Sequence, residues 1–173
     1  MKEFHMIFRI ADMNDLYQLK MVYSDIVNHM YENNIKIWDE VYPTAYFNED
    51  IKNQRLYVLE DHDTILSAFA LSDRHSGENH IKWPGKGCKA LYLDRLGVHI
   101  NYTGMGIGSI ALEKAAELAK SKGASCLRLF VVDFNKPAIN LYEKNGFKKA
   151  DGVYDEIIEE GLVFHELGYE KCI

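Results

Sequence analysis

A glycine-rich junction between a strand and a helix constrains the fold of this chain more than any other feature. The apolar run from Leu91 to Ile100 is typical of a buried central strand. The sequence Asn-Tyr-Thr-Gly-Met-Gly-Ile-Gly-Ser follows it at 101–109, and the pattern then predicts an amphipathic helix to Lys122 and a strand over 125–132. A strand, a helix and a neighbouring parallel strand require a right-handed crossover, so a βαβ unit in an α/β domain is predicted.

The start of this helix is a predicted anion site. Gly104, Gly106 and Gly108 allow the backbone to approach a ligand that a Cβ would keep away. The first N–H groups of a helix have no internal partners and carry a positive partial dipole. We therefore predict that the junction holds a pyrophosphate group.

Spacing separates three interpretations of the junction. A P-loop, Gly-x-x-x-x-Gly-Lys-Ser/Thr, needs a Lys that does not follow Gly108. A dinucleotide-binding Rossmann fingerprint needs Gly-x-Gly-x-x-Gly, whereas this chain has Gly-x-Gly-x-Gly, although Asp133 stands where a ribose-binding acid is expected. The Rossmann interpretation and a tight turn without a ligand both stay open.

Two motifs resemble the signature of the GNAT superfamily of acyl-CoA-dependent N-acetyltransferases. Thr103-x-x-Gly106-x-Gly108 takes the place of Arg/Gln-x-x-Gly-x-Gly/Ala, with Thr103 where Arg or Gln is usual. Residues 135–147 are similar to the second part, Asn-x-x-Ala-x-x-Leu-Tyr-x-Lys-x-Gly-Phe. The resemblance implies an α/β fold with a mixed, mostly antiparallel central sheet, a splayed parallel strand pair and flanking helices, in a single N-acetyltransferase domain over 1–173.

The resemblance also implies acetyl-CoA as the co-substrate. The backbone of Leu96, Gly97 and Val98 is expected to bind the pantetheine arm and the thioester carbonyl, and Gly97 to leave room for a ligand. Asn135 is expected to hold the CoA arm. The residues expected at the pyrophosphate are Thr103, Gly104, Met105, Gly106, Ile107, Gly108 and Ser109. Because Thr103 replaces a longer donor, weaker cofactor affinity is expected.

Tyr142 is the predicted general acid, since the matching tyrosine of the family protonates the departing thiolate. Without the motif, a core tyrosine would be the simpler interpretation. Asp94 is the nearest carboxylate on the cofactor strand and is a candidate general base, with a water relay as the alternative. Some relatives place a Glu in the strand before Asn135, where this chain has Phe130. Neither a metal nor a covalent enzyme intermediate is indicated.

The acceptor is expected to contact the segment between the first two predicted helices. Residues 35–47 lose helical periodicity and bring Trp38, Asp39 and Tyr42 close together. A pocket wall and a loop folded onto the core both explain this composition, and the family resemblance favours substrate contact. Trp83 and Tyr154 are weaker candidates for the same role.

Composition and net charge limit the classes of partner and the environment that are expected for this chain. A chain of 173 residues has the size of one domain, and its net charge of −6 gives no electrostatic reason to expect nucleic acid or an anionic membrane. Residues 1–10 are apolar only in short pieces, so neither a signal peptide nor a membrane span is predicted. Cys88, Cys126 and Cys172 are few and widely spaced, which predicts no disulfide framework and a reducing, cytoplasmic environment.

We therefore expect an enzyme that transfers an acetyl group from acetyl-CoA directly to a primary amine of a small-molecule or peptide acceptor. A CoA-binding sensor or interaction module without catalysis is the first alternative, and a dinucleotide-binding oxidoreductase is the second. The acceptor and the oligomeric state stay open, with a homodimer as one option.

Overall fold

The computed structural model describes residues 5–173, and the chain divides into two compact units. Unit 1 consists of Met1–Ala70 and Arg95–Lys114, and unit 2 of Leu71–Asp94 and Ala115–Ile173. The sequence predicts a first strand over residues 4–11, and its first residue, Phe4, lies outside the described residues.

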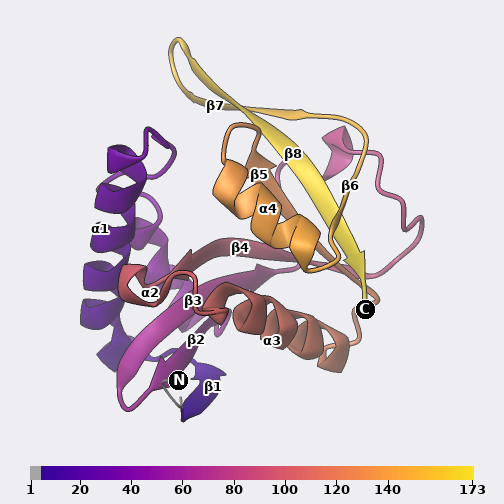
Figure 1. Ribbon diagram of the computed structural model, residues 1–173. Helices are drawn as coiled ribbons and strands as arrows, with labels where there is room; N and C mark the ends of the chain where they lie inside the picture. The colour runs from indigo at the N-terminus through magenta and orange to yellow at the C-terminus, as the bar shows by residue number, and fades with distance from the viewer. Residues whose placement is uncertain (1–4) are drawn as a thin grey trace. The chain divides into compact units, whose positions relative to one another are not determined.

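The strands form one mixed sheet in the order β1-β2-β3-β4-β5-β8-β6, and β7 pairs with β8 (Figure 1). Within residues 5–173 the parallel pair is β4 with β5, and the pairs β1–β2, β2–β3, β5–β8, β6–β8 and β7–β8 are antiparallel, so the predicted mixed and mostly antiparallel sheet is confirmed. The strands are β1 (Met6–Ile10), β2 (Leu56–Asp61), β3 (Thr64–Ser72), β4 (Ala90–Val98), β5 (Cys126–Val132), β6 (Lys148–Lys149), β7 (Tyr154–Glu159) and β8 (Leu162–Cys172).

The helices begin and end where local sequence signals place them. They are α1 (Leu16–Glu32), α2 (Phe47–Lys52), α3 (Ile107–Ser121) and α4 (Lys136–Lys144), with short 3-10 turns η1 (Met13–Asp15), η2 (Thr44–Tyr46), η3 (Glu78–His80) and η4 (Ile100–Tyr102). Asp12 forms a capping box with Asp15 ahead of α1, and Asn135 caps α4. Gly123 after α3 and Gly146 after α4 have positive φ, as expected just beyond a helix end.

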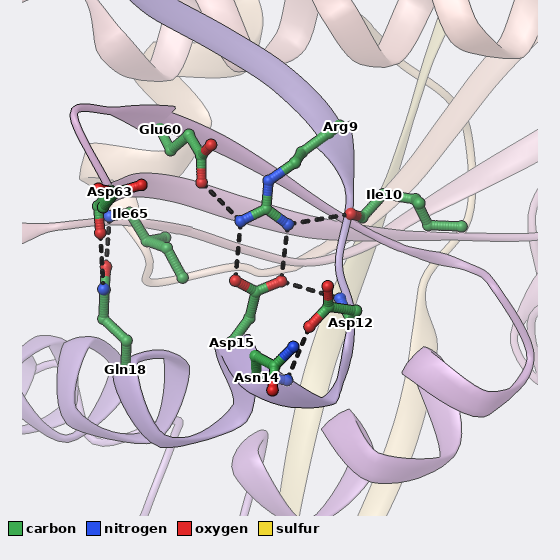
Figure 2. Close-up of polar contacts among 9 residues, drawn as sticks. All are labelled: Arg9, Ile10, Asp12, Asn14, Asp15, Gln18, Glu60, Asp63 and Ile65. Carbon is green, nitrogen blue, oxygen red and sulfur yellow. Dashed lines mark hydrogen bonds and ion pairs between the residues drawn. The ribbon is translucent and has the colours of Figure 1, made fainter.

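A half-buried cation, Arg9, joins the first elements of unit 1 (Figure 2). The guanidinium of Arg9 on β1 donates two hydrogen bonds of 2.8 Å to Asp15 and one of 2.6 Å to Glu60 on β2. The pKa of the Asp15 carboxyl is lowered, chiefly by this bond to Arg9. Gln18 on α1 bonds both Asp63 O and Ile65 N, so the start of α1 is also attached to the β2–β3 turn.

A second ion pair in unit 1 holds a break in β4. Arg95 has a φ of 54°, a left-handed conformation that costs a non-glycine residue of order 1–3 kcal/mol. Its guanidinium donates two 2.9 Å bonds to Asp50, which is completely buried, and its carbonyl accepts a 2.6 Å bond from the Tyr23 hydroxyl. The parallel pairing of β4 with β5 is confined to Ala90–Leu93, ahead of this break.

The sheet of unit 2 has two different faces. Tyr92, Arg128 and Glu170 are register partners and therefore share one face, and the loop after β3 covers it, with Trp83 lying 4.5 Å over Arg128. Helix α4 lies against β5 and β8 in Figure 1, and its Glu143 accepts a 3.0 Å bond from Tyr169, which points to the opposite face. Unit 2 thus has a helix face and a loop face.

Two expectations from the sequence are wrong in unit 2. The apolar and polar pattern of the sequence predicts one strand over 156–169, but the chain turns at Gly161, which has a φ of 83°, and forms the β7–β8 hairpin. Cys88 and Cys126 were expected to be unpaired, but they form a disulfide. The parallel register places Cys126 opposite Ala90, which brings two cysteines 38 residues apart together. The prediction of a reducing compartment was based on unpaired cysteines, so the disulfide removes its basis.

We predict that Asp50→Ala destabilises the protein by about 3–5 kcal/mol, because it removes the buried carboxylate that binds the Arg95 guanidinium. The side chain of Arg95 is only 9% exposed, whereas Glu49, which pairs with Arg55 at 3.6 Å, is mostly exposed. Glu49→Ala is the matched control and should cost less than about 1 kcal/mol. Urea unfolding of both variants measures the difference, and equal costs would contradict a structural role for the Asp50–Arg95 pair.

Candidate functional site

The glycine junction of unit 1 has the geometry of an open cradle. Gly104 and Gly106 have φ values of 75° and 82°, and a Cβ at either position would meet no atom within 4 Å. Backbone conformation therefore explains both glycines, and the space before them is open. Helix α3 begins at Ile107, so its first N–H groups lie immediately after the two glycines.

Among the other residues expected at the cofactor, some make contacts within the protein and one is exposed. The Thr103 hydroxyl donates a 2.8 Å bond to Ile100 O, so it stabilises the turn before the cradle. Met105 is exposed, whereas Ile107 is buried in a cluster with Leu59 and Leu66. The side chain of Ile107 thus anchors the junction to the core of unit 1. Contact of this segment with a cofactor stays a prediction.

The role expected for Gly97 needs a correction. A Cβ at Gly97 would lie 2.6 Å from the Tyr23 ring and 2.9 Å from Ile26, so helix α1 occupies the space that the sequence assigned to a ligand. The carbonyl of Gly97 accepts a 2.7 Å bond from the Ser67 hydroxyl. Glycine is therefore required here by helix packing. The expected cofactor contacts of Leu96, Gly97 and Val98 through their backbone stay a prediction.

The three residues expected at the acceptor pack within unit 1. Trp38 stacks on Tyr23 with ring centroids 5.6 Å apart, and Tyr42 meets Trp38 edge-on at 6.4 Å. One carboxylate oxygen of Asp39 accepts bonds of 2.7 Å from the amides of Val41 and Tyr42. These contacts explain the composition of the segment by folding onto the core, and substrate contact stays a prediction.

Tyr142 and Asp94 interact in unit 2. Tyr142 is 9% exposed and its ring lies 6.0 Å from that of Phe147. Burial raises the pKa of the Tyr142 hydroxyl, and the negative charge of Asp94 raises it further. The hydroxyl therefore keeps its proton at neutral pH, which is the form a general acid requires. Asn135, expected on the CoA arm, uses its side-chain oxygen to accept a 3.4 Å bond from Ala138 N at the start of α4.

A cluster of carboxylates on the loop face includes a residue that the sequence did not single out. Glu166 on β8 has an oxygen, Oε2, that is shielded from solvent and has no hydrogen-bond partner. Burial raises the pKa of Glu166 to about 8, with further increases from Glu156 and Asp94. The sequence alone predicts a solvated acidic face for the run Glu156, Glu159 and Glu160, but Glu156 is half-buried, unlike the other two. No sequence motif marked Glu166, because its neighbours come from three separate strands.

Aromatic rings fill the middle of the loop face. His75 stacks on Phe130 with centroids 3.9 Å apart, and Trp83 meets Phe130 edge-on at 5.5 Å. Phe130, which stands where some relatives have a Glu, thus belongs to this aromatic cluster. An open cavity of about 310 Å³ adjoins it, and Trp83, Tyr92, Arg128 and Glu78 are among its walls.

Within residues 5–173, one group of three side chains has the spacing of metal ligands. It consists of Cys88, Cys126 and Glu170. The two sulfurs are joined to each other, and the Glu170 oxygens accept bonds of 2.8 Å from Arg128 and from Gly85 N. These bonds already occupy the donor atoms that a metal would need. Over the same residues, no helix combines the length and the apolar character of a membrane span.

Comparison with known families decides between the interpretations of the glycine junction. A family model described as "Acetyltransferase (GNAT) family" matches residues 23–147, more than half of the chain. The chain belongs to the GNAT acetyltransferase family. The resemblance of the two motifs is thereby confirmed, and the Rossmann interpretation is superseded.

Curated relatives of this GNAT protein are acetyltransferases. The chain is 44% identical over 88 residues to a thialysine N-epsilon-acetyltransferase of Sus scrofa, and 45% identical over 68 residues to that of Bos taurus. These matches span 49% and 38% of the relatives' own lengths. A putative phosphinothricin acetyltransferase of Bacillus subtilis is 26% identical over 155 residues, which cover 89% of this chain and 90% of the relative.

Solved structures share the fold. A GNAT acetyltransferase from Streptococcus agalactiae superposes with a TM-score of 0.79 at 18% identity, over 99% of this chain and 98% of its own. Arabidopsis thaliana NAA60 in complex with acetyl-CoA superposes with a TM-score of 0.70 at 16% identity, over 97% and 99%. At these identities the likeness concerns the fold alone.

We predict that Glu166→Gln weakens the pH dependence of stability. The ordinary pKa of the carboxyl is 4.5 and that of Glu166 in the folded protein is about 8. Between these values the folded state keeps a proton that the unfolded state has released, so the free energy of unfolding falls as pH rises. The melting temperature of the wild type should therefore fall more from pH 5 to pH 8 than that of Glu166→Gln. Parallel curves would contradict the burial of this carboxyl, and Glu160→Gln on the exposed hairpin end serves as control.

Proposed function

We propose that this protein transfers the acetyl group of acetyl-CoA directly to a primary amine of a small-molecule or peptide acceptor. Membership of the GNAT family supports the reaction class. The observation that carries the proposal is the buried Tyr142 hydroxyl, because burial and the charge of Asp94 raise its pKa and keep it in the protonated form that an acid requires. The names of the curated relatives support amine acceptors.

The residues of the glycine junction fit the pyrophosphate of acetyl-CoA. The open space before Gly104 and Gly106 and the first N–H groups of α3 suit an anion that approaches the backbone closely. Acetyl-CoA, once bound, would supply the activated acyl group as a thioester. Main-chain groups of Leu96, Gly97 and Val98 would bind its pantetheine arm and its thioester carbonyl. Asn135 would also hold the arm of the cofactor.

Tyr142 would protonate the departing sulfur. Its raised pKa means that the hydroxyl is protonated at neutral pH, and its burial keeps competing water away. Asp94 would attract the ammonium form of the acceptor and orient its nitrogen. A proton must also leave that nitrogen, and either Asp94 or a water relay is the expected acceptor from the sequence. In this proposal the acceptor contacts the loop face of unit 2, where Asp94 lies.

We predict that Tyr142→Phe lowers kcat by about 10²–10⁴ while the Kd for acetyl-CoA changes little, because the hydroxyl acts on the leaving sulfur alone. Release of free thiol in the presence of an amine panel measures kcat, and calorimetry measures the Kd. Tyr169→Phe is the matched control, since it removes a buried hydroxyl that bonds Glu143 in the same unit. Wild-type turnover in Tyr142→Phe would refute the role of Tyr142.

The same panel tests the function itself. Acetyl-CoA binding with thiol release in the presence of at least one primary amine is the expected result. Acetyl-CoA binding without thiol release for any amine would instead support a CoA-binding sensor. Absence of acetyl-CoA binding at millimolar concentration would refute the proposed function.

A further inference from the structure

Glu166 lies on the same sheet face as Asp94. In the register of unit 2, Glu166 on β8 is opposite Val132 on β5 and opposite Tyr154 on β7. Residues two apart along a strand share a face, so Glu166 is on the face of Arg128 and Tyr92. Asp94 follows Tyr92 by two residues, ahead of the break at Arg95, and joins the same face.

The surroundings of Glu166 favour a proton and disfavour a negative charge. Its neighbour Glu156 lies on β7, two residues after the partner Tyr154, and β5 offers only the apolar Val132. In the part of the chain that the structure describes, no Lys or Arg forms an ion pair with Glu166, and its Oε2 has no hydrogen-bond partner. The titratable groups around it are Asp94 on β4, Tyr154 and Glu156 on β7, Tyr142 on α4 near Asp94, and His75 and His80 near Tyr154.

We infer that Glu166 accepts the proton that the acceptor ammonium loses before it attacks the thioester, an inference that rests on the proposed acetyl transfer. One proton moves from the nitrogen to a Glu166 oxygen, which leaves a neutral amine and a neutral carboxyl. The nitrogen lone pair then forms the C–N bond while the C–S bond breaks. The sulfur takes a proton from Tyr142, the second nitrogen proton restores that hydroxyl, and Glu166 releases its proton to water.

Glu166 suits this task better than an ordinary carboxylate. A general base works best when its pKa lies near the working pH, and an ammonium near pKa 10 gives up its proton poorly to a group near pKa 4. Burial and the charges of Glu156 and Asp94 place the pKa of Glu166 at about 8. Asp94 is then a positioning residue, which attracts the ammonium and raises the proton affinity of its neighbour. A cationic acceptor also offsets the negative charge that these three carboxyl groups share.

The pH profile of kcat/KM for a primary alkylamine, with acetyl-CoA saturating, tests the inference. If ionised Glu166 reacts with the ammonium form, kcat/KM of the wild type rises to about pH 8 and is then level. In Glu166→Gln only the free amine reacts, so the rise continues to the pKa of the amine and kcat/KM at pH 8 falls by about 10²–10⁴. Glu156→Gln should keep the level region but move its start to lower pH, because one like charge is gone.

Calorimetry with acetyl-CoA verifies that Glu166→Gln is folded and binds, and Glu159→Gln on the exposed hairpin end should retain the wild-type profile. The inference is overturned if the level region of the kcat/KM profile survives in Glu166→Gln. It is equally overturned if Glu166→Gln keeps that region and Asp94→Asn loses it. In both cases acetyl transfer by the wild type leaves the proposed function intact. Absence of turnover in the wild type with every amine overturns the function and the inference together.

Discussion

The break of β4 at Arg95 is the constraint on which the site depends. A non-glycine residue with a φ of 54° persists only where its surroundings hold it. Here a fully buried carboxylate, Asp50, binds the Arg95 guanidinium, and the Tyr23 hydroxyl binds its carbonyl. The charge-assisted bonds offset the backbone cost of order 1–3 kcal/mol. Helices α1 and α2 thus determine how the central strand runs, although both are distant from β4 in sequence.

The break also divides β4 into a part that carries an ionisable side chain, Asp94, and a part that leads to the glycine junction. Before it, β4 pairs with β5 and presents Asp94 to the face that Glu166 and Glu156 share. After it, β4 lies within unit 1, continues to the glycine junction and leads into α3. In the first part, the charge of Asp94 raises the pKa of Glu166. In the proposed function, the glycine junction that follows the second part offers backbone groups to an anion.

Much of the fold follows from local signals in the sequence. The amphipathic helix α3 and the apolar strands of the βαβ unit could be predicted, because each depends on neighbouring residues. Contacts that depend on strand register or on the packing of distant segments could not be predicted from the sequence. The Cys88–Cys126 disulfide, the packing of Tyr23 against Gly97 and the surroundings of Glu166 each join distant segments. The glycine junction was found by its motif, whereas Glu166 had no motif to mark it.

Hydrogen exchange of the backbone amides with and without acetyl-CoA tests the central claim most directly, because it locates binding by residue. If main-chain groups hold the cofactor, saturating acetyl-CoA should slow exchange at residues 96–98 and 104–109 more than elsewhere in unit 1. Unchanged exchange in both segments, with acetyl-CoA bound by calorimetry, would contradict the account.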